Sequence, residues 1–191
     1  MNESQPPRRS DTTRAEILRA ARARFAADGY QRATIRAIAA DAGIDPSMVM
    51  RYYGNKAQLF AAAVDADLRL PDVDGIPRDR LGETLVAHFI QRWEGDPTDD
   101  ALLTLLRSAA TDEDAAERLR GVFREQVAPV ALRVSADPAE AALRAGLVAT
   151  QMLGLALCRH ILRLPPVAGA TPETLVVQVG ATLQRYLTGP L

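Results

Sequence analysis

The stretch ATIRAIAADAGIDPSMVMRYYGNKAQLF, from Ala33 to Phe60, has the pattern of two short helices joined by a tight turn. Thr34 carries the side chain of a good helix N-cap. Apolar residues then recur at the three- and four-residue spacing of one helix face: Ile35, Ile38, Ala39 and Ala42. Gly43 follows, where a residue free to adopt positive φ lets the chain leave the last turn, and Ile44 supplies an apolar plug. The spacing therefore predicts a short helix that ends in a sharp turn.

A second helix is predicted directly after this turn, from about Pro46 to Tyr53. Asp45 is a good N-cap, and Pro46 suits the first helical position because its missing N–H would have no intrahelical partner there. Val49 and Tyr53 lie four residues apart, so they share the face that would pack on the first helix. Two helices joined in this way are typical of a DNA-binding helix-turn-helix.

The second helix leaves several side chains on its other faces, and these are candidates to meet DNA: Ser47, Met48, Arg51 and Tyr52. Gly54 and Asn55 then break this helix and cap the next one. Lys56 consequently lies in a first helical turn, where free backbone N–H groups already favour a phosphate and the ammonium adds to the attraction.

These positions resemble the TetR family of bacterial transcriptional regulators, over about the first third of the chain. The residues that carry the resemblance are Thr34, Arg36, the turn from Ala39 to Ile44, and the run from Met50 through Tyr53, Gly54, Asn55 and Lys56 to Leu59-Phe60. The family usually has an aromatic residue, most often Tyr, where this chain has Met50, and His or Phe where it has Tyr52. Met50 therefore departs from the family pattern.

Roles for the DNA-facing side chains follow from their chemistry and from the resemblance. Arg36 matches a family position that often reaches base edges, and Arg pairs bidentately with guanine N7 and O6; a solvated helix-face Arg is the alternative. Met48 suits a thymine methyl group, whereas Met50 fits a groove contact or packing equally well. Phosphate contacts are expected from Thr34, Tyr52 and Lys56. The predicted DNA-binding set is Thr34, Arg36, Pro46, Ser47, Met48, Met50, Arg51, Tyr52 and Lys56.

Charge is distributed unevenly along the chain. Ten basic and six acidic residues precede or include Lys56, a net charge of +4, whereas the whole chain carries −1, so the remainder carries −5. A basic head on an acidic body fits a protein that binds phosphates at one end. Arg8 and Arg9 belong to an N-terminal tail that would either reach along DNA or remain solvated.

Composition indicates a globular protein, because 48% of its 191 residues are hydrophobic. No run of about 18 apolar residues and no signal-peptide core are evident, so we expect a cytoplasmic protein without a membrane partner. The single cysteine, Cys158, has no intrachain disulfide partner. An enzyme is disfavoured, because Cys158 and His160 are two residues apart on a predicted helix and no Gly-rich phosphate loop occurs. We expect no catalytic residue, metal site or cofactor.

Helical periodicity continues through the rest of the chain without a strand pattern. Thr13 to Glu16 has capping-box spacing ahead of a helix that ends at Asp28-Gly29, and a connecting helix is predicted from Lys56 through Leu68. Further helices are predicted over about 81–93, 101–110, 112–127 with Pro129 kinking or ending it, 137–162 and 172–187. The predicted fold is all-α with about nine helices: a three-helix DNA-binding head, residues 1–56, and a C-terminal helical bundle, residues 57–191.

The last two predicted helices are more apolar than a surface element needs. Asp137, Pro138 and Glu140 form a capping box for the first of them. The two helices would either finish the monomer core or pair across a two-fold axis as a four-helix bundle, and the resemblance implies the second, a homodimer. The candidate dimer residues are Gly146, Met152, Gly154, Leu155, Ile161, Val179 and Leu183.

The resemblance also implies a small-molecule effector held in the bundle, whose binding releases the DNA. Polar and aromatic residues that interrupt the apolar faces are candidates to line its pocket, each also compatible with core or surface: His88, Trp93, Arg107, Phe123, Gln126, Gln151 and His160. The expected function is that of a repressor that binds a palindromic operator in double-stranded DNA. A dimeric DNA-binding protein without an effector is the alternative.

Overall fold

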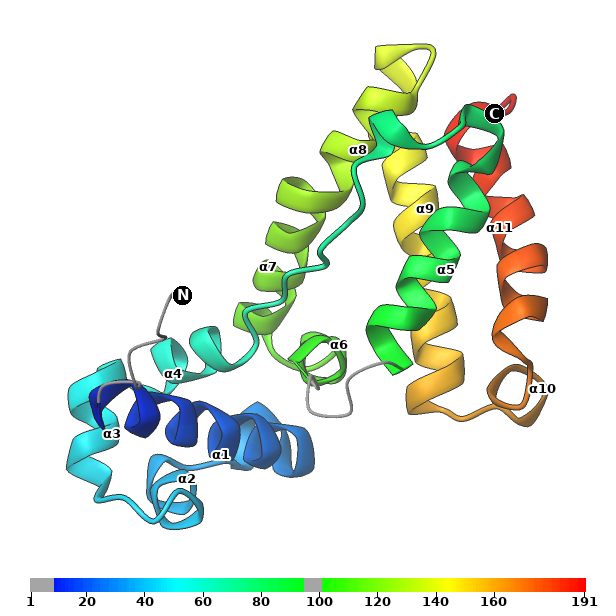
Figure 1. Cartoon of the computed structure of the whole chain (residues 1–191). Helices are drawn as coiled ribbons and strands as arrows, with labels where there is room; N and C mark the ends of the chain where they lie inside the picture. Colours follow the sequence, from blue (N-terminus) through cyan, green and yellow to red (C-terminus); the bar gives the residue numbers. More distant parts are fainter. Residues whose placement is uncertain (1–8, 95–100) are drawn as a thin grey trace, which may run out of the picture. The chain divides into compact units, whose positions relative to one another are not determined.

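The computed structural model describes residues 9–94 and 101–191, and most of these residues are helical (Figure 1). No β-strand occurs in these two ranges. The all-α class predicted from periodicity is thus confirmed.

The described residues divide into two compact units. The first comprises the chain up to Asp65 and a later segment that ends at Arg118. Its helices are α1 (Arg9–Arg32), α2 (Ile35–Asp41), α3 (Pro46–Tyr53), α4 (Lys56–Ala63), α6 (Ala101–Ala109) and the beginning of α7 (Glu113–Val122). The helices α2 and α3 and the turn between them are those that the sequence predicted.

An aromatic and aliphatic core holds the first unit together. Phe25 of α1 and Phe60 of α4 meet edge to face, with their ring centroids 5.0 Å apart, and both side chains are buried. Ile38 of α2 and Val49 of α3 are also fully buried. Because each helix contributes at least one large apolar side chain, α1 to α4 pack as one body.

The start of α1 differs from its prediction. Thr13 was expected to cap this helix in a capping box with Glu16, but α1 already includes Arg9 and Thr13 lies inside it. Asp11 occupies the first described turn, where a negative charge is favourable near the helix N-terminus. The predicted end of this helix at Asp28-Gly29 agrees with the structure, because Gly29 interrupts the helical backbone with a φ of 72°.

The second unit is a helical bundle. Its elements are η1 (Val73–Gly75), η2 (Arg78–Arg80), α5 (Leu81–Glu94), the rest of α7, η3 (Phe123–Val127), α8 (Ala128–Val134), η4 (Pro138–Glu140), α9 (Ala141–Ala156), η5 (Leu157–Ile161), α10 (Pro165–Ala168) and α11 (Pro172–Thr188). Leu81, Val86, Leu183 and Leu187 are among its most deeply buried side chains. The core therefore lies chiefly along α5 and α11, which run side by side in Figure 1.

Two glycines allow α5 and α11 to approach closely. A Cβ atom added at Gly82 would lie 2.1 Å from the carbonyl oxygen of Gly180, and one added at Gly180 would lie 2.9 Å from Cα of Glu83. Gly82 and Gly180 are both buried. The two backbones are therefore in direct contact at a point where no larger residue fits.

The connecting helix is shorter than predicted. It was expected to run through Leu68, but α4 ends at Ala63 and the following residues are not helical. Their backbone groups bond to side chains instead: Gln126 binds Ala66 and Leu68, and the imidazole Nε2 of His88 lies 2.9 Å from the carbonyl oxygen of Leu68. These contacts replace the hydrogen bonds that another turn of helix would have formed.

Pro129 does not end its helix. A π-helical turn, η3, precedes it, in which the N–H of Ala128 donates to the carbonyl oxygen of Phe123, and α8 then continues to Val134. Proline cannot donate to the carbonyl four residues earlier and clashes with it, so a wider turn accommodates the ring without ending the helix.

The predicted capping box before α9 is only half formed. Asp137 accepts a hydrogen bond from the N–H of Ala139, as a cap should. Glu140 was expected to complete the box, but its carboxylate instead accepts two hydrogen bonds from Arg144, of 3.0 and 2.6 Å. The full charge of the guanidinium is the stronger donor for this carboxylate.

Candidate functional site

The helix-turn-helix is held in place by short-range hydrogen bonds. Thr34 Oγ1 accepts from the N–H of Ala37 at 3.1 Å, which caps α2. In the turn, Gly43 has a φ of 65° and the N–H of Ile44 donates to the carbonyl oxygen of Ala39. These contacts confirm the predicted helix start and turn, and they fix where the exposed side of α2 lies.

The start of α3 is fixed by Asp45 and Ser47. Asp45 Oδ1 accepts from both the N–H and the hydroxyl of Ser47, at 2.8 and 2.6 Å. The hydrogen bond from the Ser47 side chain, with that from its backbone, holds the pKa of the Asp45 carboxyl below its ordinary value. The hydroxyl of Ser47, a predicted DNA contact, is thus engaged in capping the helix in the free protein.

The side chains of α2 and α3 that were predicted to contact DNA differ in exposure. Arg36 and Arg51 are exposed, and Met50 is 44% exposed, so the Met50 side chain is not part of the core. Pro46, Met48 and Tyr52 are half-buried. The protein therefore presents one arginine from each motif helix, with Met50 beside Arg51.

Lys56 has partners that the sequence did not reveal. Its Nζ donates to the carbonyl oxygen of Gln31 at 3.1 Å and lies 4.6 Å from the ring centroid of Tyr30. Burial lowers the pKa of the Lys56 amine, and Asp112 acts in the opposite direction. The amine therefore ties the start of α4 to the end of α1 in the free protein.

A separate ion pair joins α1 to α2. Two nitrogens of Arg24 donate to the two carboxylate oxygens of Asp41, at 2.7 and 2.6 Å, and Arg24 also reaches Asp28 at 3.2 Å. The hydrogen bonds from Arg24 lower the pKa of the Asp41 carboxyl. Arg24 is thus committed to holding the helices together.

The candidate effector residues fall into separate groups. His88 and Gln126 hold the segment around Leu68, whereas Trp93 and His160 stack on each other with their ring centroids 5.4 Å apart. Arg107 is exposed on α6, which belongs to the first unit. Phe123 and Gln151 are half-buried in η3 and α9. Within residues 9–94 and 101–191, the contacts of these side chains do not bring them around one cavity.

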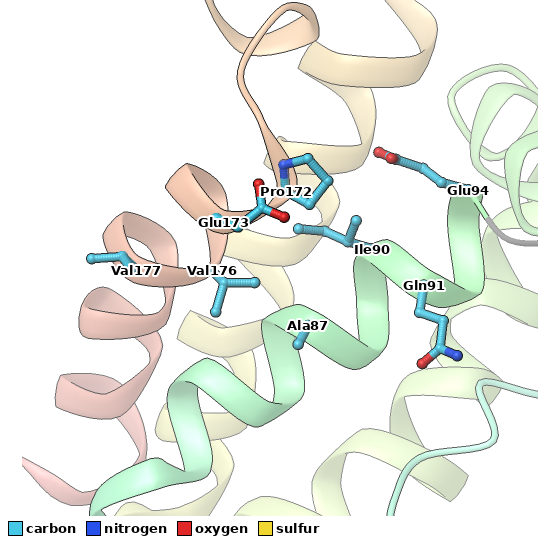
Figure 2. A pocket seen from close by; sticks show the side chains of 8 residues that line it. All are labelled: Ala87, Ile90, Gln91, Glu94, Pro172, Glu173, Val176 and Val177. Atoms are coloured by element: carbon cyan, nitrogen blue, oxygen red, sulfur yellow. The ribbon is translucent and has the colours of Figure 1, made fainter.

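A surface groove of about 580 Å³ lies between the end of α5 and the beginning of α11 (Figure 2). It is lined by Ala87, Ile90, Gln91, Glu94, Pro172, Glu173, Val176 and Val177. None of the predicted effector residues lines it. Glu94 is also bound by Arg159, whose Nε donates to it at 2.6 Å, so one of the two carboxylates at the groove is already paired.

The candidate dimer residues divide by burial. Leu155 and Leu183 are 6% and 0% exposed and belong to the core of the second unit, so they are not available to a partner. Met152, Ile161 and Val179 are half-buried. Gly146 and Gly154 face open space, because a Cβ atom at either would meet nothing within 4 Å.

Large apolar side chains are exposed on the same helices. Leu143 and Val177 are 60% and 54% exposed, and Leu157 is 40% exposed. The helical stretch Pro138–Ile161 is long and apolar enough to cross a membrane by length and composition, but such a helix is also common in the core of soluble proteins. These exposed positions are therefore more apolar than a solvated surface needs.

Comparison with known proteins identifies the family. Residues 17–63 match the family described as bacterial regulatory proteins, tetR family, and residues 79–187 match the tetracyclin repressor-like C-terminal domain. The chain belongs to the TetR family. Both the family and the general function inferred from the helix-turn-helix, transcriptional regulation, are confirmed.

Individual TetR-family relatives agree with this assignment. The chain is 41% identical over 97 residues to the HTH-type transcriptional repressor SCO4008 of Streptomyces coelicolor, an alignment covering 44% of this chain and 50% of the relative. The chain thus spans about half the length of the curated relative it matches. The TetR-family regulator SCO0857 of Streptomyces coelicolor A3 is 30% identical, with a TM-score of 0.66 and coverage of 96% of this chain and 99% of that one.

The fold is also that of NalD, described as the secondary repressor of the MexAB-OprM multidrug efflux pump in Pseudomonas aeruginosa. NalD is 21% identical, with a TM-score of 0.68, and the match covers 93% of this chain and 97% of NalD. At this identity the likeness concerns the TetR fold alone.

Proposed function

We propose that this TetR-family regulator is a repressor that binds a palindromic operator as a homodimer and is released by a small-molecule effector. The observation that carries the proposal is the α2–α3 motif, whose caps hold Arg36 and Arg51 on exposed helix faces. A helix with such side chains reads base edges in the major groove.

The DNA-binding residues in this proposal have two tasks. Arg36, Ser47, Met48, Met50 and Arg51 contact bases or the groove wall. Thr34, Pro46 and Lys56 lie at helix N-termini, where phosphates bind, whereas Tyr52, near the C-terminal end of α3, offers only its hydroxyl as a phosphate contact. The Lys56 amine also donates a hydrogen bond to the carbonyl oxygen of Gln31. Its main contribution to DNA binding is therefore the positive charge that it places at the N-terminus of α4.

The dimer in this proposal forms through α9 and α11. Exposed Leu143, Leu157 and Val177 supply apolar area, and open space at Gly146 and Gly154 admits a partner helix. A two-fold interface places the same residues on both sides. It also sets two recognition helices at the spacing that a palindromic site demands.

The effector acts by shifting populations. A ligand that prefers the conformation with weak DNA affinity lowers binding by its differential affinity for the two conformations. The groove between α5 and α11 has the composition of a ligand site, with an apolar lining and few polar groups. A cytoplasmic location follows from the same proposal, because the operator is genomic DNA.

The DNA-binding part is tested by selecting duplexes from a random-sequence library with the purified protein. We expect a two-fold symmetric consensus, and Arg36→Ala should weaken its binding by about 1–3 kcal/mol and relax preference at one or two base pairs. Arg118→Ala, which removes an exposed arginine from α7, is the matched control. A selected site without symmetry, or unchanged affinity and preference in Arg36→Ala, would contradict the proposal.

The dimer and effector parts need their own measurements. Sedimentation should show a dimer that Val177→Asp weakens, whereas Gln178→Asp, at an adjacent exposed position of α11, serves as a control for added charge. A screen of small apolar molecules should find compounds that both raise the melting temperature and lower affinity for the selected duplex. If no compound does both, the protein acts as an effector-independent DNA-binding dimer.

A further inference from the structure

Arg14 of α1 lies against the recognition helix α3. The hydroxyl of Tyr53 donates to the backbone carbonyl oxygen of Arg14 at 3.2 Å, across 39 residues of sequence. This hydrogen bond fixes one turn of α1 beside the end of α3. It therefore determines where the Arg14 side chain begins.

The ring of Tyr52, the residue before Tyr53, lies close to the guanidinium of Arg14. The Cζ atom of Arg14 lies 5.5 Å from the ring centroid of Tyr52, and the Cζ atom of Arg51 lies 5.6 Å from it. Both distances are within the range in which a guanidinium is attracted by an aromatic ring. One half-buried tyrosine thus gathers two exposed arginines, one from α1 and one from α3.

Neither guanidinium is committed elsewhere in the part of the chain that the structure describes. Two other arginines of α1 are occupied: Arg24 binds Asp41 and Asp28, and Arg22 donates to the carbonyl oxygen of Ala63 at 2.9 Å. Arg14 and Arg51 have no carboxylate partner among the described residues. Two unneutralised positive charges held on one ring repel each other, and an anion bound to both relieves that repulsion.

We propose that Arg14 contacts a DNA phosphate and that Tyr52 positions it through its ring rather than binding phosphate through its hydroxyl. The inference rests on the proposed DNA-binding function and deepens it in two ways. It adds a residue of α1, which lies outside the helix-turn-helix, to the DNA interface. It also makes Tyr52 a positioning residue for Arg14 and Arg51.

A role for the Tyr52 ring and a role for the Tyr52 hydroxyl predict different effects of substitution. If the ring is what matters, Tyr52→Phe retains the platform and full DNA affinity, whereas Tyr52→Leu loses the platform. If the hydroxyl binds phosphate, both variants lose affinity. The two substitutions therefore separate positioning from direct contact.

The experiment measures binding to two duplexes, one selected from a random library by the wild-type protein and one of unrelated sequence. Arg14→Ala should weaken both complexes by a similar factor, about tenfold at moderate salt, because a phosphate contact carries no sequence information. The slope of log affinity against log salt should fall by about 0.9 per protomer. Arg19→Ala, which removes an exposed arginine from the same helix, is the matched control.

Coupling between the two residues completes the test. Tyr52→Leu removes the ring beneath both Arg14 and Arg51. The double variant should therefore lose less affinity than the two single losses combined, because the Arg14 contact is lost only once; fully additive losses would show that Tyr52 does not act through Arg14. Helix content and melting temperature confirm folding, and Arg14→Gln replaces Arg14→Ala if the alanine variant does not fold.

Two further results would overturn the inference while leaving DNA binding intact: equal affinity in Arg14→Ala and Arg19→Ala, or a loss in Tyr52→Phe as large as that in Tyr52→Leu. A wild-type protein that selects no duplex would instead overturn the proposed function, and this inference with it.

Discussion

The side-chain carbonyl oxygen of Gln126 accepts a hydrogen bond of 2.7 Å from the backbone N–H of Leu68. The same amide group donates from Nε2 to the carbonyl oxygen of Ala66 at 2.9 Å, so Gln126 binds both sides of one short extended segment. These three residues are all in the second unit. The π-helical turn η3, which contains Gln126, is therefore anchored directly to the chain that leaves α4.

Replacing Gln126 should destabilise the protein. Gln126→Ala removes both hydrogen bonds and leaves partly buried backbone groups without these partners, which should cost about 1–3 kcal/mol of unfolding free energy. Urea titration measures the loss. Gln178→Ala, at an exposed position of α11, should change the free energy by no more than about 0.5 kcal/mol. Equal stability of the two variants would show that the anchor contributes nothing.

Replacing glycine by alanine should have opposite effects on stability at Gly82 and at Gly121. Gly82→Ala places a methyl group 2.1 Å from the carbonyl oxygen of Gly180, so α5 and α11 must separate, at a cost of about 1–3 kcal/mol or more. Gly121→Ala places it 4.0 Å from its nearest neighbour, a side-chain nitrogen of Arg124, and should stabilise α7 by about 0.5–1 kcal/mol. Denaturant unfolding of both variants checks the contrast, which fails if both change stability in the same direction.

His160 should make stability depend on pH near neutrality. Burial lowers the pKa of this imidazole below its ordinary value of 6.5; Glu94 opposes the shift and Arg159 adds to it. The unfolded chain therefore binds the proton first as the pH falls. The contribution of the neutral ring is fully present above about pH 6.5 and is lost as the pH falls through the lower folded pKa.

The measurement uses the single tryptophan, Trp93, against which His160 stacks. Urea unfolding followed by its fluorescence should show falling stability from about pH 7 to 5. His160→Phe keeps an aromatic ring there and should lose part of this dependence. Identical pH profiles for the two proteins would contradict the assignment.

Arg144 should stabilise the C-terminal end of α11. It is 5% exposed, and its guanidinium donates to the carbonyl oxygens of Tyr186 and Gly189, at 2.7 and 2.9 Å, as well as to Glu140. Arg144→Lys keeps the charge but not the planar fork that reaches all three. We expect both Arg144→Lys and Arg144→Ala to lose about 2 kcal/mol or more in denaturant unfolding, whereas Arg185→Ala, exposed on α11, should lose less. Full stability of the lysine variant would refute this role.

The features that were predictable from sequence are those decided within a few residues. Thr34, Asp45 and Asn55 each cap a helix by accepting from an N–H two or three positions later, so local spacing is sufficient to find them. The same holds for Thr171, which accepts from the N–H of Thr174 at the start of α11. The starts of α2, α3 and α4, which bound the motif on which the DNA-binding proposal depends, are set by such contacts.

The features that escaped prediction depend on residues far apart in the chain. Gln126 bonds to Ala66 and Leu68 in the non-helical segment after α4, and the partner of the Tyr52 ring is Arg14 on another helix. No sequence pattern over a few residues predicts either contact. Lys56 was correctly placed in a first helical turn, but its hydrogen bond to Gln31 requires the kinked end of α1, which periodicity does not describe.

The contact between Gly82 and Gly180 is a fixed crossing point between α5 and α11. It lies at the start of α5 and at the middle of α11, whereas the groove lies toward the end of α5 and the beginning of α11. Because the backbones already touch at this crossing point, the helices cannot move closer there. An occupant that narrows the groove must therefore tilt one helix against the other about the crossing point, so a small displacement at the groove becomes a rotation of α11.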